Sequence, residues 1–297
     1  MWSGTDSGKK SLVAWKTVCQ EYDRGGLQIK GVLSWNDSVI GYLVVQLANP
    51  NRKDTVLTNW IQHNKLAHVD FMQVTCKQAD SSWWKVILHM RDLLLSKMPD
   101  FQVQLVGLPG KLVTHRIYDC LVPKAAVVPW YNQVWRSFSS LRTSFLYWII
   151  VLRRLPTKDR LVRFDILSDS TCSLCGTVTE SHDHIFCQCS FTSFILDKIM
   201  TVVGVRFRGQ FQFFSVGGCK TPMVLKLRNA GFCCVLDTIW LTRNNVCFRE
   251  GPVNVELASK QAATNFLALI NKHCKSPQNR FIIGVLSKLQ RFELDKI

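Results

Sequence analysis

The sequence predicts a mainly α-helical protein with a small zinc-stabilised module of the form C-x2-C-x8-H-x4-C. Two observations support this fold class. Apolar residues recur at helical spacing in segments spread along the chain, and one cluster of cysteine and histidine has the spacing of a metal site. The chain has 297 residues and is 47% hydrophobic, so it can bury a substantial core.

The helical pattern appears first in residues 35–68 and 81–97, so the first third is predicted to be mainly helical. Residues 142–155 are apolar on almost every side, which predicts a deeply buried helix. Its expected last turn carries Arg153 and Arg154, which suit the negative end of the helix dipole. Pro156 and Thr157 are expected to end it and to begin a short helix over residues 158–164. Further helices are predicted over residues 223–243 and 255–273.

Glycine and proline clusters at residues 25–26, 107–110, 217–218 and 251–252 are typical of turns or linkers. They divide the chain roughly into thirds. We expect a helical region over residues 1–115, a zinc-binding domain over 116–205 and a C-terminal helical region over 206–297.

The chain is strongly basic, with 37 Lys and Arg against 21 Asp and Glu and a formal net charge of +16. Such an excess favours polyanionic partners, because each phosphate contact releases condensed counterions. Nucleic acid is the leading partner class, and an anionic membrane surface is the alternative. The longest apolar run, near residues 145–152, is under half of the roughly 20 residues that a spanning helix needs. The N-terminus does not have the pattern of a secretory signal, so we expect an intracellular protein, nuclear or cytoplasmic.

Twelve cysteines are present, and most are scattered singly through apolar segments, which favours reduced, buried thiols. One cluster differs: Cys172 and Cys175, then His184 and Cys189. A Cys-x-x-Cys turn lets two thiolates share one metal ion, and the second pair completes a tetrahedron. Three thiolates and one imidazole fill the coordination sphere of zinc, which predicts a structural site. His182 and Cys187 are alternatives, because either one can replace His184 or Cys189 as a ligand.

A basic stretch precedes this cluster and contains one carboxylate, Asp159. It is a candidate site for the phosphates of RNA or single-stranded DNA, with little sequence preference. The alternative interpretation is a solvated basic face at the ends of helices. Trp148 lies at helical spacing and is expected in the core. The six candidate cations are Arg142, Arg153, Arg154, Lys158, Arg160 and Arg163.

Read with its flanks, the cysteine cluster resembles the zinc-binding domain that follows the reverse transcriptase in plant LINE-type non-LTR retrotransposons. The resemblance covers roughly residues 2–250 and is most specific from Trp130 to Cys189. The chain departs from the family pattern at Gln28, Leu196 and Cys187, none of which is a preferred ligand. The motifs that carry it are Trp130, Trp135 and Trp148, residues 155–161, Cys172 to Cys175, Glu180 and Ser181, residues 184–186, Cys189, Ile239 and Trp240, Arg243 to Asn245, and Phe248.

The resemblance implies an accessory module that holds nucleic acid, and a reverse transcriptase chain as a possible partner. It begins only beyond the catalytic palm of such polymerases, so the polymerase core is expected to be absent. Polymerase catalysis also needs paired aspartates to hold two metal ions, and the sequence has no Asp-Asp dipeptide. We therefore expect no enzymatic activity. The second hypothesis is a zinc-braced helical module that binds other proteins, in which the positive charge is incidental.

Overall fold

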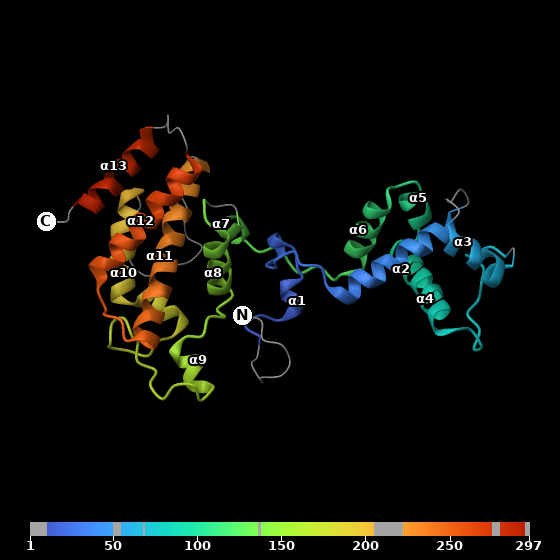
Figure 1. Cartoon of the computed structure of the whole chain (residues 1–297), viewed down its shortest axis with the longest axis horizontal. Coiled ribbons are helices and arrows are strands. Elements are labelled where there is room, and N and C mark those ends of the chain that lie inside the picture. Colours follow the sequence, from blue (N-terminus) through green and yellow to red (C-terminus); the bar gives the residue numbers. More distant parts are fainter. Residues whose placement is uncertain are drawn as a thin grey trace. The chain divides into compact units, whose positions relative to one another are not determined.

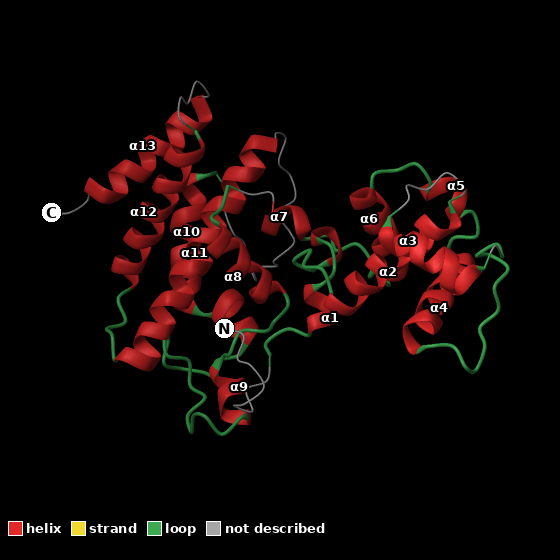
Figure 2. Ribbon diagram, turned by 45° about the vertical axis from the view of Figure 1, so that its right-hand side comes forward, coloured by secondary structure: helices red, strands yellow, loops and turns green. Residues whose placement is uncertain are grey.

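The computed structural model describes residues 11–49, 55–67, 69–135, 138–204, 222–274 and 280–294. Every regular element in these ranges is a helix, and the remaining residues form loops (Figure 2). The one β-type pairing among them is an isolated antiparallel bridge between Thr171 and Thr179. The predicted fold class, mainly α with a small candidate metal module, is thus confirmed. No helix in the described ranges is long and apolar enough to cross a membrane.

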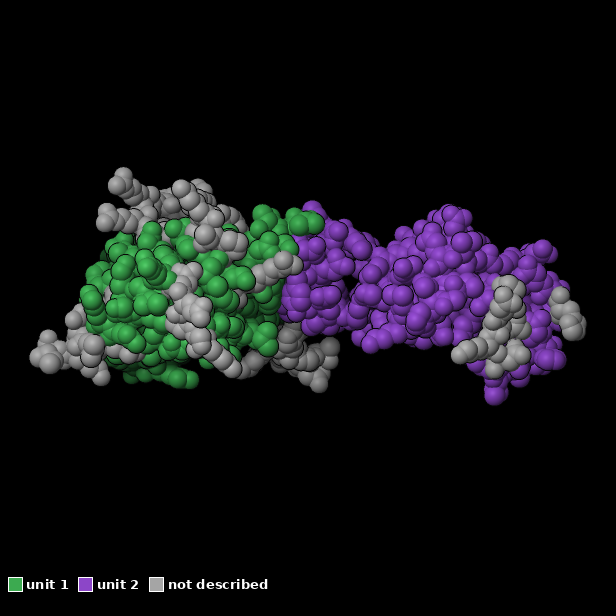
Figure 3. Space-filling model, turned by 90° about the horizontal axis from the view of Figure 1, so that it is seen from above, with its two compact units in different colours: residues 1–14, 127–297 green, residues 15–126 purple. Residues whose placement is uncertain are grey.

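The chain divides into two compact units (Figure 3). Unit 2 comprises residues 15–126, and unit 1 comprises the residues before and after it. The predicted division into three regions, 1–115, 116–205 and 206–297, stays a prediction. The structure divides near residue 126, which is not one of the predicted boundaries. The described residues after 126, from both the second and the third predicted region, belong to one unit.

Unit 2 is built around two packed helices, α2 (Val32–Ala48) and α6 (Gly110–Leu121) (Figure 1). They approach closely because Gly41 of α2 has no side chain: a Cβ there would lie 3.0 Å from Ile117 of α6. Helix α4 (Ser82–Lys97) also packs on α2, and Trp84, Leu88 and Leu94 of α4 are buried in the shared core. The shorter elements are α1 (Trp15–Val18), η1 (Tyr22–Arg24), α3 (Val56–Ile61), η2 (Gln62–Leu66) and α5 (Phe101–Leu105).

Unit 1 has a core of three mutually packed helices, α10 (Ser190–Val202), α11 (Pro222–Arg249) and α12 (Val255–His273) (Figure 1). Helix α8 (Leu141–Val151) packs on α11, and α13 (Arg280–Leu294) packs on α12. Trp148 of α8 is 1% exposed, so it belongs to the core as predicted. Between α8 and α10 lie α9 (Lys158–Arg163) and the turn η3 (His184–Gln188); α7 (Tyr131–Trp135) precedes α8.

Three predicted helices have the expected bounds within a residue, namely α4, α9 and α12. The predicted helix over residues 35–68 is instead interrupted after Ala48. Asn49 is extended there, with ψ 117°, because it precedes Pro50, and a following proline disfavours the helical conformation. The helix predicted over 223–243 continues to Arg249.

The prediction for residues 142–155 was wrong at its end, because α8 stops at Val151. Arg153 has a left-handed backbone, with φ 55°. Its N–H donates to the carbonyl of Ile150, and the N–H of Arg154 donates to that of Ile149. These two bonds form a Schellman motif, which closes a helix before any proline is reached. Arg153 and Arg154 therefore follow the helix and do not lie in its last turn.

Candidate metal centre

The first cysteine pair lies in a tight backbone knuckle. The N–H of Cys172 donates to the carbonyl of Val178 at 2.8 Å, and the N–H of Gly176 donates back to the carbonyl of Cys172 at 2.9 Å. Gly176 has φ 69°, a left-handed conformation in which a Cβ is strained. The bend places the Cys175 thiol beside the Cys172 thiol. The Thr171–Thr179 bridge closes the base of the knuckle.

The second pair spans the turn η3 and the start of α10. The N–H of Cys189 donates to the carbonyl of His184 at 2.7 Å, and this hydrogen bond closes residues 184–189 into one wide turn. The same turn brings both side chains to the knuckle. Cys189 directly precedes α10, where free backbone N–H groups favour a thiolate.

The four predicted side chains form one group. Their ligand atoms, three Sγ and one imidazole nitrogen, all lie within 4.8 Å of one another. The Sγ of Cys175 is 3.3 Å from Nε2 of His184. Zinc–sulfur bonds of 2.3 Å in a tetrahedron separate the sulfurs by about 3.8 Å, so these atoms need only small shifts to share one ion. Cys172, His184 and Cys189 are buried, and Cys175 is partly exposed.

The thiols also have the electrostatics of a cation site. A hydrogen bond with Cys189, together with burial, raises the pKa of Cys172 well above its ordinary value. The same hydrogen bond lowers the pKa of Cys189. The two sulfurs are thus close enough to share a hydrogen bond. A divalent cation bound by thiolates takes the place of their protons, so the donor set fits a metal ion.

Neither alternative ligand belongs to this group in the described structure. His182 is 9% exposed and its ring lies against that of Phe186, with centroids 5.1 Å apart. Burial, with a smaller effect from Arg153, lowers its pKa to about 4, so His182 is a neutral residue of the core. Burial, with a contribution from Asp183, raises the pKa of Cys187 to about 12.

Comparison with known families places this geometry in context. Residues 113–195 match the family model described as zinc-binding in reverse transcriptase. The matched stretch contains all four side chains of the group. Searches of curated proteins and of solved structures found no match. The resemblance seen in the sequence is thus supported for the zinc-binding region of reverse transcriptases, and its assignment to plant LINE elements stays a prediction.

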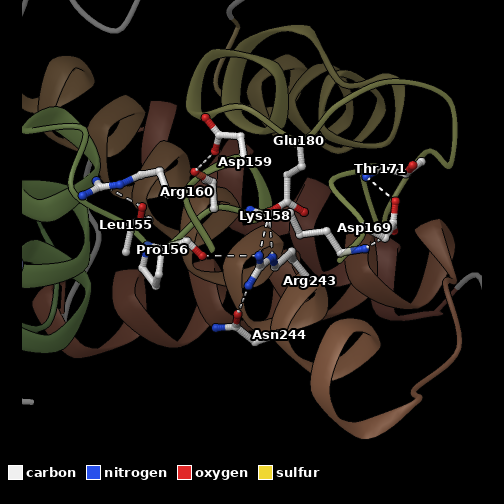
Figure 4. Close-up of polar contacts among 11 residues, drawn as sticks. Leu155, Pro156, Lys158, Asp159, Arg160, Asp169, Thr171, Glu180, Arg243 and Asn244 are labelled. Atoms are coloured by element: carbon white, nitrogen blue, oxygen red, sulfur yellow. Dashed lines mark hydrogen bonds and ion pairs between the residues drawn. The ribbon is translucent and has the colours of Figure 1, made fainter. Parts of the chain in front are cut away.

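A buried ion pair holds the knuckle against the long helix α11 (Figure 4). Oε1 of Glu180, which lies in the loop between Cys175 and His184, accepts hydrogen bonds from Nη2 of Arg243 at 2.7 Å and from Nε at 2.9 Å. Both side chains are 0% exposed. We call this pair the Glu180–Arg243 clamp.

The clamp also involves the start of α9. The same Oε1 accepts the backbone N–H of Lys158, so Glu180 caps α9 from a distant part of the chain. The guanidinium of Arg243 lies near the rings of Trp240 and Phe248 and donates to the carbonyl of Pro156. Knuckle, α9 and α11 therefore meet at one carboxylate. The sequence motifs included both residues but gave no sign that they pair.

The six candidate cations are less available than the sequence suggested. Four of them pair with carboxylates, where the sequence had shown Asp159 alone. The pairs are Arg142 with Asp237 at 3.8 Å, Arg153 with Asp183 at 2.8 Å, Lys158 with Asp169 at 3.0 Å and Arg163 with Asp159 at 3.1 Å.

The other two cations differ from each other. Arg160 donates to the carbonyls of Arg153 and Leu155, and burial together with Arg154 lowers its pKa. Arg154 is exposed and pairs with no carboxylate in the described ranges. Arg142 lies near the start of α8, and Arg153 follows its end. At a helical rise of 1.5 Å per residue the two positions are about 16 Å apart. The exposed arginines near Arg160 are therefore Arg153, Arg154 and Arg163, which we call the arginine patch.

Proposed function

We propose that this chain is a non-catalytic, zinc-binding and nucleic-acid-associated module derived from the reverse transcriptase protein of a LINE-type retrotransposon. The observation that carries the proposal is the group of three cysteines and one histidine with ligand atoms within 4.8 Å, inside a stretch that matches a zinc-binding family of reverse transcriptases.

Cys172, Cys175, His184 and Cys189 are the proposed zinc ligands. Zinc coordinated by three thiolates and an imidazole has no open position for water, so the metal stabilises structure. In the described part of this chain the knuckle contains no regular helix or strand and has a single isolated bridge. Its order therefore depends on the metal, on the Glu180–Arg243 clamp and on the packing of η3 against α10.

The net charge of +16 supports association with nucleic acid, and the arginine patch supplies exposed cations. One of them, Arg153, pairs with Asp183, which directly precedes the candidate ligand His184. We propose that the patch contacts phosphates of RNA or single-stranded DNA with little regard to sequence. The test is the binding of a labelled oligonucleotide, measured by anisotropy at several salt concentrations. Replacing Arg153, Arg154 and Arg163 by Gln should weaken binding and reduce the logarithmic salt slope by about two, because each lost contact to a single strand contributes about 0.7.

The matched control removes three exposed cations elsewhere in unit 1, by changing Arg249, Lys272 and Lys288 to Gln. Its net charge equals that of the patch variant. If both variants bind with the same affinity and slope, the patch has no special role and only overall charge matters. Circular dichroism must show that both are folded, because Arg153 also ends a helix.

The proposal that the module is non-catalytic rests on the sequence, which has no Asp-Asp dipeptide for a two-metal site. A primer-extension assay with the purified chain and Mg²⁺ should give no product. Metal-dependent extension that persists through purification contradicts it. A separate reverse transcriptase chain remains the proposed protein partner, and co-sedimentation with such a polymerase measures that association.

The second candidate is a zinc-braced helical module that binds proteins. The carboxylate partners of four of the six cations favour it, since paired charges attract phosphates less strongly. Under this alternative the arginine-patch variant binds nucleic acid as the parent does, and zinc removal abolishes protein binding.

A further inference from the structure

Unit 2 has a surface groove. Of its lining residues only His115 lies within residues 113–195, the stretch that matches the zinc-binding family. The groove lies between the start of α2, with Lys30 just ahead of that helix, and the N-cap and first two turns of α6, and its volume is about 510 Å³. The lining residues are Lys30, Trp35, Pro109, Lys111, Leu112 and His115.

The floor of this groove is apolar and aromatic. Trp35 is 38% exposed and Leu112 is 39% exposed, although unit 2 has a core in which such side chains are normally placed. The ring of Trp35 packs against the tilted ring of Tyr118, with centroids 5.9 Å apart. Trp35 is thus a supported ring that stays partly exposed. An exposed aromatic ring stacks well on another flat ring.

The rim of the groove is cationic. Lys30 and Lys111 line it, and no carboxylate does. The ammonium of Lys30 is 4.0 Å from the ring centroid of Tyr118 and 5.9 Å from that of Trp35. It donates to Nδ1 of His115 at 3.2 Å, since an ammonium cannot accept. A fixed positive charge therefore lies beside the exposed aromatic face.

An aromatic floor with a positive rim is complementary to a flat ring that carries negative charge beside it. We propose that this groove binds one base of a single-stranded nucleic acid, stacked on Trp35, with Lys30 and Lys111 at the flanking phosphates. This inference rests on the proposed nucleic-acid association and adds a second contact site, in unit 2. It also predicts a preference for unpaired strands, because a paired base cannot enter the groove.

The experiment compares two fluorescent 12-residue strands, oligo-dT and a strand of abasic residues, which has the same phosphates and no bases. The full chain is titrated into each, and anisotropy gives both affinities. Trp35→Ala should weaken oligo-dT binding about tenfold, within the range measured for base–aromatic stacking, and leave the abasic strand unaffected. Changing Lys30 and Lys111 to Gln should weaken binding of both strands.

Trp60→Ala is the matched control, because Trp60 is also a partly exposed tryptophan of unit 2 but lies outside the groove. It should bind both strands as the parent does. Leu112→Glu is a second test at an exposed position, and a carboxylate at the groove should weaken binding of both strands by repelling their phosphates.

The inference fails if folded Trp35→Ala loses equal affinity for both strands, or if neither Trp35→Ala nor Leu112→Glu changes binding. In either case strand binding itself persists, so the proposed function stands. If the parent binds neither strand, both proposals are overturned.

Discussion

Breaking the Glu180–Arg243 clamp should destabilise unit 1 far more than breaking an exposed ion pair. The perturbation is Glu180→Gln, which keeps the shape of the side chain and removes its charge. Arg243 then stays fully buried without a carboxylate. Removing one partner of a buried pair costs about 3–5 kcal/mol, because the remaining charge is desolvated and uncompensated.

A second variant separates the charge from the rest of the contact. Glu180→Leu with Arg243→Met removes both charges, and replacing a whole buried pair by apolar residues is often close to neutral. Here the backbone N–H of Lys158 also loses its acceptor, which costs about 1–3 kcal/mol. The double variant should therefore be more stable than Glu180→Gln, even though it carries more changes.

The assay is unfolding in urea followed by circular dichroism, with Glu256→Gln as the control. Glu256 pairs with Lys198 at 2.7 Å in the same unit, but its side chain is 59% exposed. An exposed pair contributes at most about 1 kcal/mol. The same comparison can be made by heating. A loss of 1 kcal/mol lowers Tm by about 2–4 °C for a unit of this size, so Glu180→Gln should lower Tm by roughly 10 °C. If Glu180→Gln costs no more than Glu256→Gln, the clamp does not hold the knuckle and this reasoning is wrong.

Two further predictions concern single residues of unit 1. Arg153→Gly should be about 1 kcal/mol more stable than Arg153→Ala in thermal unfolding. Both variants lose the exposed pair with Asp183, but only glycine adopts the left-handed φ of 55° without strain. Equal stabilities contradict the assigned backbone. Burial raises the pKa of Asp237 above 3.8, against a smaller lowering by Arg142. A raised carboxyl pKa contributes stability that is full below pH 3.8 and is lost as the pH rises through the folded-state pKa. Asp237→Asn should therefore raise Tm at pH 7 and have little effect below about pH 4; a lower Tm at pH 7 shows that the carboxylate is stabilising.

The regular helices could be predicted because their signals are local. In α12 the apolar residues recur at helical spacing, and Asn254 caps the first turn by accepting the N–H of Leu257. The first pair of candidate metal ligands was also predictable as a pair, since the turn geometry of Cys-x-x-Cys limits where the thiols can lie. The choice of His184 over His182 agrees with the group that the structure brings together.

The features that could not be predicted depend on distant residues or on an unusual backbone. Helix α8 ends with arginine where glycine is the usual residue, so the sequence had no marker for the Schellman motif. Glu180 and Arg243 are 63 positions apart, and nothing local links them. The carboxylates that pair with Arg142 and Arg153 likewise come from other parts of the chain, so counting charges within the basic stretch overestimated how much unpaired positive charge the folded chain has there.

The central claim is that four side chains hold one structural zinc ion, and elemental analysis of the purified chain tests it most directly. The parent should contain one zinc per chain, and Cys172→Ser should lose it, because three remaining donors bind far more weakly. Cys234→Ser, at a buried cysteine of α11 outside the group, should retain it. A parent without zinc, or equal zinc in the two cysteine variants, contradicts the assignment.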